Sequence, residues 1–431
     1  MRRRLDVITL GCSKNLVDSE RILRMFTEAG FDARHEPEGE PGEIVVINTC
    51  GFIGDAKEES IEMILRYASA KTEGRVKSLY VMGCLSQRYR DDLIKEIPEV
   101  DGWYGKFDWT ALVAELSKRH AATVSYDRVI TTPSHHAYLK IAEGCNRFCA
   151  FCAIPLITGR YASRPAGEIL YEVRTLVGRG VKEFNVIAQD LSSYGMDIDG
   201  TLQLPGLIDA IADIPGVEWI RLHYAYPAQF PYGILDVMAR RDNVCSYLDI
   251  ALQHVSDKVL ANMRRHITGR ETRELLAEIR RRVPGIHIRT TLMVGFPGEG
   301  EEEFEELLEF VREQRFERMG AFAYCEEDDT YAAKHLEDSV PQEVKEERLS
   351  RLMALQEQIA FERNSEKVGR VLRVIVDRED ADYYVGRTEW DSPEVDPEVL
   401  IRKDVRLQRG EFYNVRIVDA LPFELIGEIA E

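Results

Sequence analysis

The sequence predicts an α/β protein built from three parts. Strand-like and helix-like patterns alternate as far as residue 365, which indicates parallel sheets with helical crossovers. From about residue 367 the hydrophobic pattern changes to period two, which is typical of short strands in a small β-barrel. We therefore expect three domains with the bounds 1–130, 131–365 and 366–431.

The N-terminal domain is predicted to be a doubly wound parallel sheet. Its apolar runs predict strands over residues 5–10, 43–48 and 77–82. Between and after them, apolar residues recur at helical spacing. The predicted helices cover residues 18–29, 56–68 and 87–97.

The central domain repeats the same alternation six times. Strands are predicted over residues 138–142, 183–188, 219–224, 246–252, 287–295 and 319–324, and helices over 168–179, 207–213, 234–241, 270–282 and 301–314. Six units are too few for a closed eight-stranded barrel. We expect a partial, open (βα)6 barrel, with a long helix over residues 342–366 at its end.

The C-terminal domain is predicted to be a small antiparallel barrel of five strands. Four strands can be placed, over residues 371–376, 383–388, 412–418 and 424–429.

Composition limits where the protein acts and what it binds. The apolar runs are too short to span a bilayer, and the basic residues 2–4 lead into Asp6 without a long apolar segment. We expect a cytoplasmic protein with no membrane partner. The formal net charge of −19 argues against nucleic acid as the main partner and fits a basic protein better.

Three of the eight cysteines are closely spaced, as Cys145, Cys149 and Cys152. They follow the first strand of the central domain in the pattern Cys-x-x-x-Cys-x-x-Cys. Three thiolates can hold three irons of a 4Fe–4S cluster and leave the fourth iron open to a small molecule. Structural zinc, the competing interpretation, usually needs four protein ligands.

Three further cysteines, Cys12, Cys50 and Cys84, each follow a predicted strand and precede a predicted helix, next to glycine. In a parallel sheet, the loops that connect strands to the following helices all lie at the same edge of the sheet. The three thiols can therefore converge on a second metal site. The alternative is three buried structural cysteines. Cys245 and Cys325 fit no pattern and are expected in the core, and Arg264-Arg265 is expected on a helix surface.

The segment from Glu143 to Cys152 resembles the signature loop of radical S-adenosylmethionine (SAM) enzymes. The resemblance implies that the open iron binds SAM and that Phe151 lies near its adenine. It also implies SAM contacts from polar residues at the strand ends and after the cysteine loop. The expected contacts are Gln189, Gln253, Gly295, Glu299, Arg160 and Arg164. A loop or helix-capping role is the alternative for the residues at the strand ends, and a surface role is the alternative for the two arginines.

The three parts together resemble the methylthiotransferase family over essentially the whole chain. That resemblance implies two 4Fe–4S clusters, SAM as methyl donor and radical source, and a C-terminal TRAM domain. The six clustered cysteines are then both catalytic and metal-binding residues. One branch of the family, RimO, modifies ribosomal protein S-twelve. Three segments of this sequence resemble that branch: Leu10-Gly11-Cys12-Ser13-Lys14-Asn15, Ile47-Asn48-Thr49-Cys50-Gly51 and Tyr247-Leu248-Asp249-Ile250-Ala251-Leu252-Gln253-His254.

The predicted reaction is addition of a methylthio group to the β-carbon of an aspartate in ribosomal protein S-twelve. Residues 366–431 hold 10 Lys and Arg against 16 Asp and Glu, a net charge of −6, which suits a basic protein substrate. Two alternatives remain: a tRNA adenosine methylthiotransferase (the MiaB branch), and a zinc-stabilised binding protein attached to the ribosome. The sequence identifies neither the sulfur donor nor the electron donor.

Overall fold

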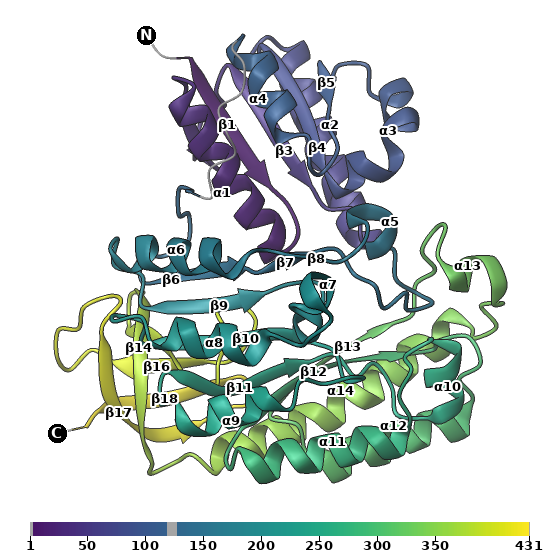
Figure 1. Ribbon diagram of the computed structural model, residues 1–431, viewed down its shortest axis with the longest axis vertical. Helices are drawn as coiled ribbons and strands as arrows, with labels where there is room; N and C mark the ends of the chain where they lie inside the picture. Colours follow the sequence, from purple (N-terminus) through teal and green to yellow (C-terminus); the bar gives the residue numbers. More distant parts are fainter. Residues whose placement is uncertain (1–2, 119–126, 431) are drawn as a thin grey trace.

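The computed structural model describes residues 3–118 and 127–430. This part of the chain contains a five-stranded sheet, a six-stranded sheet and a closed five-stranded barrel, in that order along the sequence (Figure 1). The predicted fold class is confirmed.

The N-terminal sheet is parallel throughout, with the strand order β2-β1-β3-β4-β5. Every residue of β3 is buried, as expected for a strand covered on both faces. The strands are β1 (Arg4–Thr9), β2 (Asp32–His35), β3 (Ile44–Thr49), β4 (Ser78–Gly83) and β5 (Gly102–Trp103); β2 and β5 were not anticipated.

Helices cover both faces of this sheet. One apolar core lies under α1 (Ser13–Glu28) and α4 (Trp109–Ser117), and the other lies under α2 (Gly54–Thr72) and α3 (Cys84–Glu96). The chain leaves β1 toward β2 on one side and then passes to β3 on the other. The strand order therefore reverses between β1 and β3, which is where open α/β sheets bind ligands.

The central sheet is also parallel, and its order β13-β12-β11-β10-β9-β6 follows the sequence without closing. This is the open six-stranded arrangement that the pattern predicts. Its strands are β6 (His136–Lys140), β9 (Glu183–Ile187), β10 (Trp219–Ala225), β11 (Val244–Ile250), β12 (His287–Val294) and β13 (Arg318–Ala323). A short antiparallel pair, β7 (Ala142–Glu143) and β8 (Ala162–Ser163), flanks the cysteine loop.

Helices pack along the outside of the central sheet, over the largest apolar core. They are α6 (Ala166–Val177), α8 (Leu204–Ala212), α9 (Gly233–Arg240), α11 (Gly269–Arg282), α12 (Glu301–Gln314) and α14 (Gln342–Ser365); the shorter helices are α5 (Ile154–Thr158), α7 (Met196–Asp199), α10 (Asp257–Asn262) and α13 (Tyr331–His335). Within residues 3–118 and 127–430, no helix combines the length and the apolar character needed to cross a bilayer.

The C-terminal barrel closes in the order β14-β15-β16-β18-β17. Sequence reasoning did not place β16, and β16 pairs with β18 in parallel, so the barrel is not purely antiparallel. The strands are β14 (Val371–Glu379), β15 (Tyr383–Thr388), β16 (Glu398–Arg402), β17 (Phe412–Ala420) and β18 (Glu424–Ile429).

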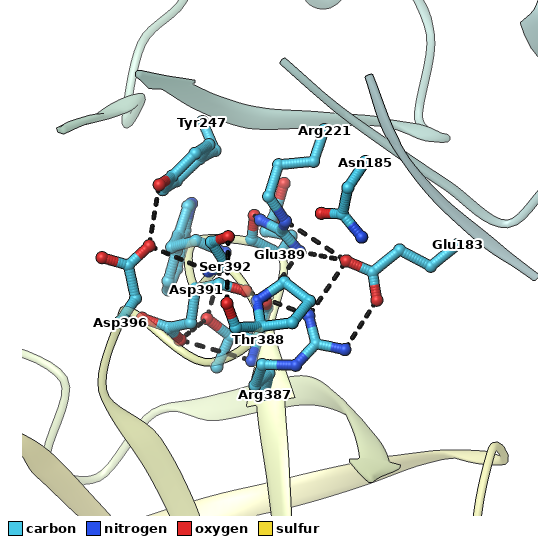
Figure 2. A network of polar contacts seen from close by, with 12 residues as sticks. Glu183, Asn185, Arg221, Tyr247, Arg387, Thr388, Glu389, Asp391, Ser392 and Asp396 are labelled. Carbon is cyan, nitrogen blue, oxygen red and sulfur yellow. Dashed lines mark hydrogen bonds and ion pairs between the residues drawn. The ribbon is translucent and has the colours of Figure 1, made fainter. Parts of the chain in front are cut away.

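A buried polar network attaches this barrel to the amino-terminal ends of the central strands (Figure 2). Glu183, the first residue of β9, pairs with Arg387 at 2.7 Å and with Arg221 at 3.2 Å. Burial opposes the charge on Glu183, but the two guanidinium groups outweigh it and lower the pKa of that carboxyl from 4.5 to about 2. The loop from β15 to β16 adds Asp391, which accepts from Arg318 at 2.6 Å.

We expect Glu183→Gln to lower the free energy of unfolding by about 3 kcal/mol, because two buried guanidinium groups lose their shared carboxylate. The depressed pKa adds stability above about pH 4.5 that is lost as pH falls toward 2, so this variant should also show a weaker acid dependence. Urea unfolding at several pH values measures both.

Glu218→Gln is the matched control, since Glu218 pairs with Arg373 across the same junction but both side chains are almost half exposed. Its loss should cost less than about 1 kcal/mol. Equal losses in the two variants would contradict the role assigned to Glu183.

Candidate active site

The six clustered cysteines line one cavity of about 320 Å³ between the N-terminal and central sheets. In Figure 1, β1, β3 and β4 point their carboxyl ends at the central domain, above the loops that carry the second triad. The two sets of cysteines are 61 residues or more apart in the sequence, so only the packing of the two sheets brings them together. Both predicted metal sites therefore share a single cavity.

The first triad lies where the strand order of the N-terminal sheet reverses. Cys12 caps α1 after β1, Cys50 follows β3, and Cys84 begins α3 after β4. Gly11, with φ of +88°, allows the close approach: a Cβ on it would lie 2.8 Å from the Cys50 sulfur. A larger residue there would push two of the three thiols apart.

The thiols of this triad differ electrostatically. Burial raises the pKa of Cys50, and it raises the pKa of Cys84 to about 12. At Cys12, the charges of Lys14 and Lys106 outweigh the opposing effect of burial and lower the pKa of the thiol. One thiolate is thus favoured by nearby cations, while the other two thiols would lose their protons on binding a metal.

The second triad sits on the loop that follows β7. Gly144, with φ of +81°, lies against the carbonyl of Arg160, and a Cβ on it would approach that oxygen to 2.1 Å. The backbone N–H of Arg147 donates to the Cys145 sulfur at 3.5 Å. Arg265 donates to the Cys149 sulfur at 3.3 Å. Such hydrogen bonds to sulfur are the kind that tune the potential of an iron–sulfur cluster.

Phe151, Gln189 and Gln253, three of the predicted SAM contacts, also line this cavity. The side-chain oxygens of Gln189 and Gln253 are buried and accept no hydrogen bond from the described residues. Buried polar atoms rarely remain unpartnered, so these two oxygens fit the N–H or O–H groups of a bound molecule. The Phe151 ring meets Phe296 edge to face, with centroids 6.1 Å apart.

The other four predicted SAM contacts lie outside the cavity lining. Glu299 is buried 2.8 Å from Arg348 and 3.3 Å from His254, and it accepts the backbone N–H of Gly295. Arg164 pairs with Glu172 at 2.7 Å, while Arg160 is exposed. These contacts support the fold locally, and a role of the four residues in SAM binding stays a prediction.

Several residues that sequence reasoning did not assign to the site also form the walls. Lys106 follows β5 in the same strand-to-helix position as the cysteines, a signal that could have found it. Arg265 is 3% exposed and faces Cys149, so the helix-surface expectation for it is wrong. The further lining residues are Lys14, Asn15, Phe52, Arg147, Ile154, Ile157, Thr158, Tyr224, Ala225, Tyr226 and Ala251.

The two remaining cysteines differ from each other. Cys245 lies in the core of the central sheet, as expected. Cys325 is exposed, because it follows the edge strand β13 where no neighbouring strand covers it. In the described ranges, no group of three or more His, Cys, Asp or Glu side chains is arranged to hold a single metal ion.

Three family descriptions match successive parts of the chain. Residues 4–105 match the uncharacterized protein family UPF0004, residues 139–311 the Radical SAM superfamily, and residues 368–430 the TRAM domain. The Radical SAM superfamily implies a 4Fe–4S cluster and SAM.

Solved structures share the fold of the two larger parts. The radical SAM methyltransferase TsrM from Kitasatospora setae, solved with cobalamin and a 4Fe–4S cluster, matches with a TM-score of 0.56 over 75% of each chain, at 15% identity. The cobalamin-dependent radical enzyme OxsB matches with a TM-score of 0.53 over 80% of this chain and 56% of its own, at 13% identity. At such low identity these likenesses concern the fold alone.

Full-length relatives are far more similar. The chain is 59% identical to the ribosomal protein uS12 methylthiotransferase RimO of Parabacteroides distasonis, and 59% identical to that of Bacteroides fragilis, over 99% of both chains in each case. It is 47% identical to the same enzyme of Cytophaga hutchinsonii, over 100% of this chain and 98% of that one. The chain therefore belongs to the RimO family of radical SAM methylthiotransferases, the branch that the sequence motifs around its cysteines resemble.

Proposed function

We propose that this enzyme adds a methylthio group to the β-carbon of an aspartate in ribosomal protein uS12, using two 4Fe–4S clusters. The observation that carries the proposal is the convergence of two cysteine triads on one cavity. A reaction that joins sulfur to an unactivated carbon needs a sulfur-bearing site and a hydrogen-removing site beside the same substrate atom. The family assignment argues against the alternative of a non-catalytic, zinc-stabilised binding protein.

Cys145, Cys149 and Cys152 would hold the cluster that works with SAM. When bound, that cluster and SAM supply one-electron chemistry that removes hydrogen from carbon, and SAM also supplies the methyl group. The amide oxygens of Gln189 and Gln253 would accept hydrogen bonds from SAM, and Phe151 would contact its adenine. Arg265 holds the Cys149 sulfur in place by donating to it at 3.3 Å.

Cys12, Cys50 and Cys84 would hold the second cluster, which carries the sulfur to be transferred. Lys14 and Lys106 favour negative charge at this site, since both lower the pKa of the Cys12 thiol. The apolar and aromatic part of the lining, including Phe52, Phe151 and Ile157, keeps water from the reacting atoms.

Charge favours a protein substrate over tRNA. The net charge is −19 for the chain and −6 for residues 366–431, whereas a barrel that grips RNA needs a basic surface. The similar proteins of full length are named for uS12. We infer further that the enzyme acts in the cytoplasm, and that residues 1–130, 131–365 and 366–431 are the cluster-bearing, radical SAM and TRAM domains.

We expect Cys84→Ala to lower the iron content from about eight to about four atoms per chain after anaerobic reconstitution, because one of two four-iron clusters loses a ligand. Methylthiolation should disappear, while reductive cleavage of SAM should persist. Cys145→Ala should lower the iron content to the same extent, but here SAM cleavage should be lost together with methylthiolation. Iron analysis and chromatography of the SAM products make the comparison.

Cys325→Ala is the control, since Cys325 is exposed and lies outside the cavity. It should keep all the iron and both activities. Full iron and unchanged turnover in Cys84→Ala would instead contradict the second cluster.

The substrate is tested by giving the reconstituted enzyme SAM, sulfide and a reductant with either a uS12 loop peptide or unmodified tRNA. We expect mass spectrometry to find one hydrogen replaced by a methylthio group on the peptide aspartate, and tRNA to remain unchanged. Product on tRNA alone would keep the chemistry and overturn the substrate.

A further inference from the structure

We propose that Lys14 binds the carboxylate of the aspartate that is modified, with Tyr224 as the second wall of this carboxylate site. The inference rests on the proposed function and adds the residue that selects the substrate side chain.

The charged residues that line this cavity are all cationic: Lys14, Lys106, Arg147 and Arg265, with no Asp or Glu in the lining formed by the described residues. The thiolates that would hold the two clusters carry the negative charge of this cavity, so a bound carboxylate would be favoured only beside one of these four cations. Which cation can receive it depends on which of the four already has a partner.

Three of the four cations are committed to other groups. Lys106 pairs with Asp18 at 3.0 Å, and Arg147 pairs with Asp190 at 2.7 Å. Arg265 donates to the Cys149 sulfur and to the carbonyl of Ala251. These bonds leave few free donors for a substrate carboxylate; on Arg265 the buried Nε–H is without a partner among the described residues, and that side chain is already turned to the Cys149 sulfur.

Lys14 differs, because no salt bridge to a carboxylate holds it in the described structure. Its ammonium lies 3.3 Å from the centre of the Tyr224 ring, and the side chain is 9% exposed. The nearest group to this ammonium is therefore an aromatic ring, and an incoming carboxylate would be a stronger partner for it than the ring face. A charge-assisted hydrogen bond from this amine to the substrate would be short and strong.

The position of this pair suits the reaction. Lys14 lies in the first turn of α1, two residues after Cys12 and on the side of the first triad. Tyr224 is the penultimate residue of β10, in the central domain that carries the second triad. The modified β-carbon must lie between the two triads, and its carboxylate is one bond away. A carboxylate held where the two domains meet would place that carbon in the gap.

Tyr224 also has an unusual backbone. Its φ is +63°, a left-handed conformation that bulky residues rarely adopt, and its N–H lies 3.4 Å from a carboxylate oxygen of Asp249. Strained residues of this kind gather at functional sites, where the surroundings hold them in place. In this conformation the face of the ring meets the Lys14 ammonium.

Two other roles for Lys14 compete with this one: support of the Cys12 thiolate alone, and binding of the SAM carboxylate. Both predict that loss of Lys14 harms cofactor loading whatever the substrate side chain. Lys14 lies two residues after Cys12, on the side of the first triad, whereas SAM is expected beside the second triad. The carboxylate role alone predicts an effect that depends on the substrate aspartate.

The test is a double-mutant cycle on anaerobic holoenzyme with two uS12 loop peptides, one with the target aspartate and one with asparagine. Calorimetry should find that wild type binds the aspartate peptide roughly 10- to 100-fold more tightly, as expected for a hydrogen bond between charged groups. Lys14→Met should bind both peptides about as weakly as wild type binds the asparagine peptide, and Lys14→Arg should recover part of the preference. SAM affinity should stay at the wild-type value, and any loss of iron that follows from the weaker Cys12 thiolate should affect the binding of both peptides alike.

Arg24→Gln is the matched control, because Arg24 lies on the same helix, is partly exposed, and pairs with Glu28 and Asp127 outside the cavity lining. It should keep the full preference for aspartate. If Lys14→Met keeps that preference, or loses SAM affinity, the carboxylate role is overturned while the proposed function stands. Wild type that binds neither peptide and modifies tRNA would overturn both proposals.

Discussion

The cavity depends on how firmly the N-terminal sheet is held against the central sheet, and a chain of buried charges makes this connection. Asp18 on α1 lies 3.0 Å from the amine of Lys106 and also accepts a hydrogen bond from Lys140, the last residue of β6. Lys140 in turn pairs with Glu143 at 2.7 Å, two residues before Cys145. Because these groups are almost wholly buried, removal of one would leave the others uncompensated. The network therefore fixes the separation of the two triads.

The same network orients Gln189, a cavity residue that we propose to contact SAM. Burial raises the pKa of Glu143, but Lys140 and Lys106 lower it further, to about 2, so the carboxylate stays charged near neutral pH. Gln189 donates its amide N–H to this carboxylate. Since the amide nitrogen is committed there, the amide oxygen is the atom left for a ligand. One set of charges thus joins the domains and orients a cavity group.

Patterns that repeat along the chain were predictable, and contacts set by packing were not. Each cysteine of the first triad follows a strand and precedes a helix, so parallel topology alone predicted their convergence. Glu299 occupies a similar strand-end position, but Arg348 on α14 captures its carboxylate at 2.8 Å, and no local signal marks that pairing. Arg265 lies in a loop without any pattern, and only the packing brings it to Cys149.

Strand β16 was also not predicted, because packing and not a local sequence pattern determines its extended conformation. Its five residues pair with β15 on one side and with β18 on the other, so its extended form depends on closure of the barrel more than on its own short pattern. The parallel pairing with β18 joins segments separated by the whole of β17. A period-two pattern indicates strands but carries no information about which strands become neighbours.

The C-terminal barrel also supports the cavity wall, although it packs at the other end of the central sheet. Asp396, in the loop from β15 to β16 shown in Figure 2, accepts hydrogen bonds from Tyr247 at 2.7 Å and Arg289 at 3.3 Å. Arg289 lies 3.7 Å from Asp249, the carboxylate beside the backbone N–H of Tyr224. The left-handed conformation of Tyr224 costs free energy and persists only where its surroundings enforce it. The barrel therefore contributes to the shape of the active site through buried charges, apart from any contact that it makes with a substrate.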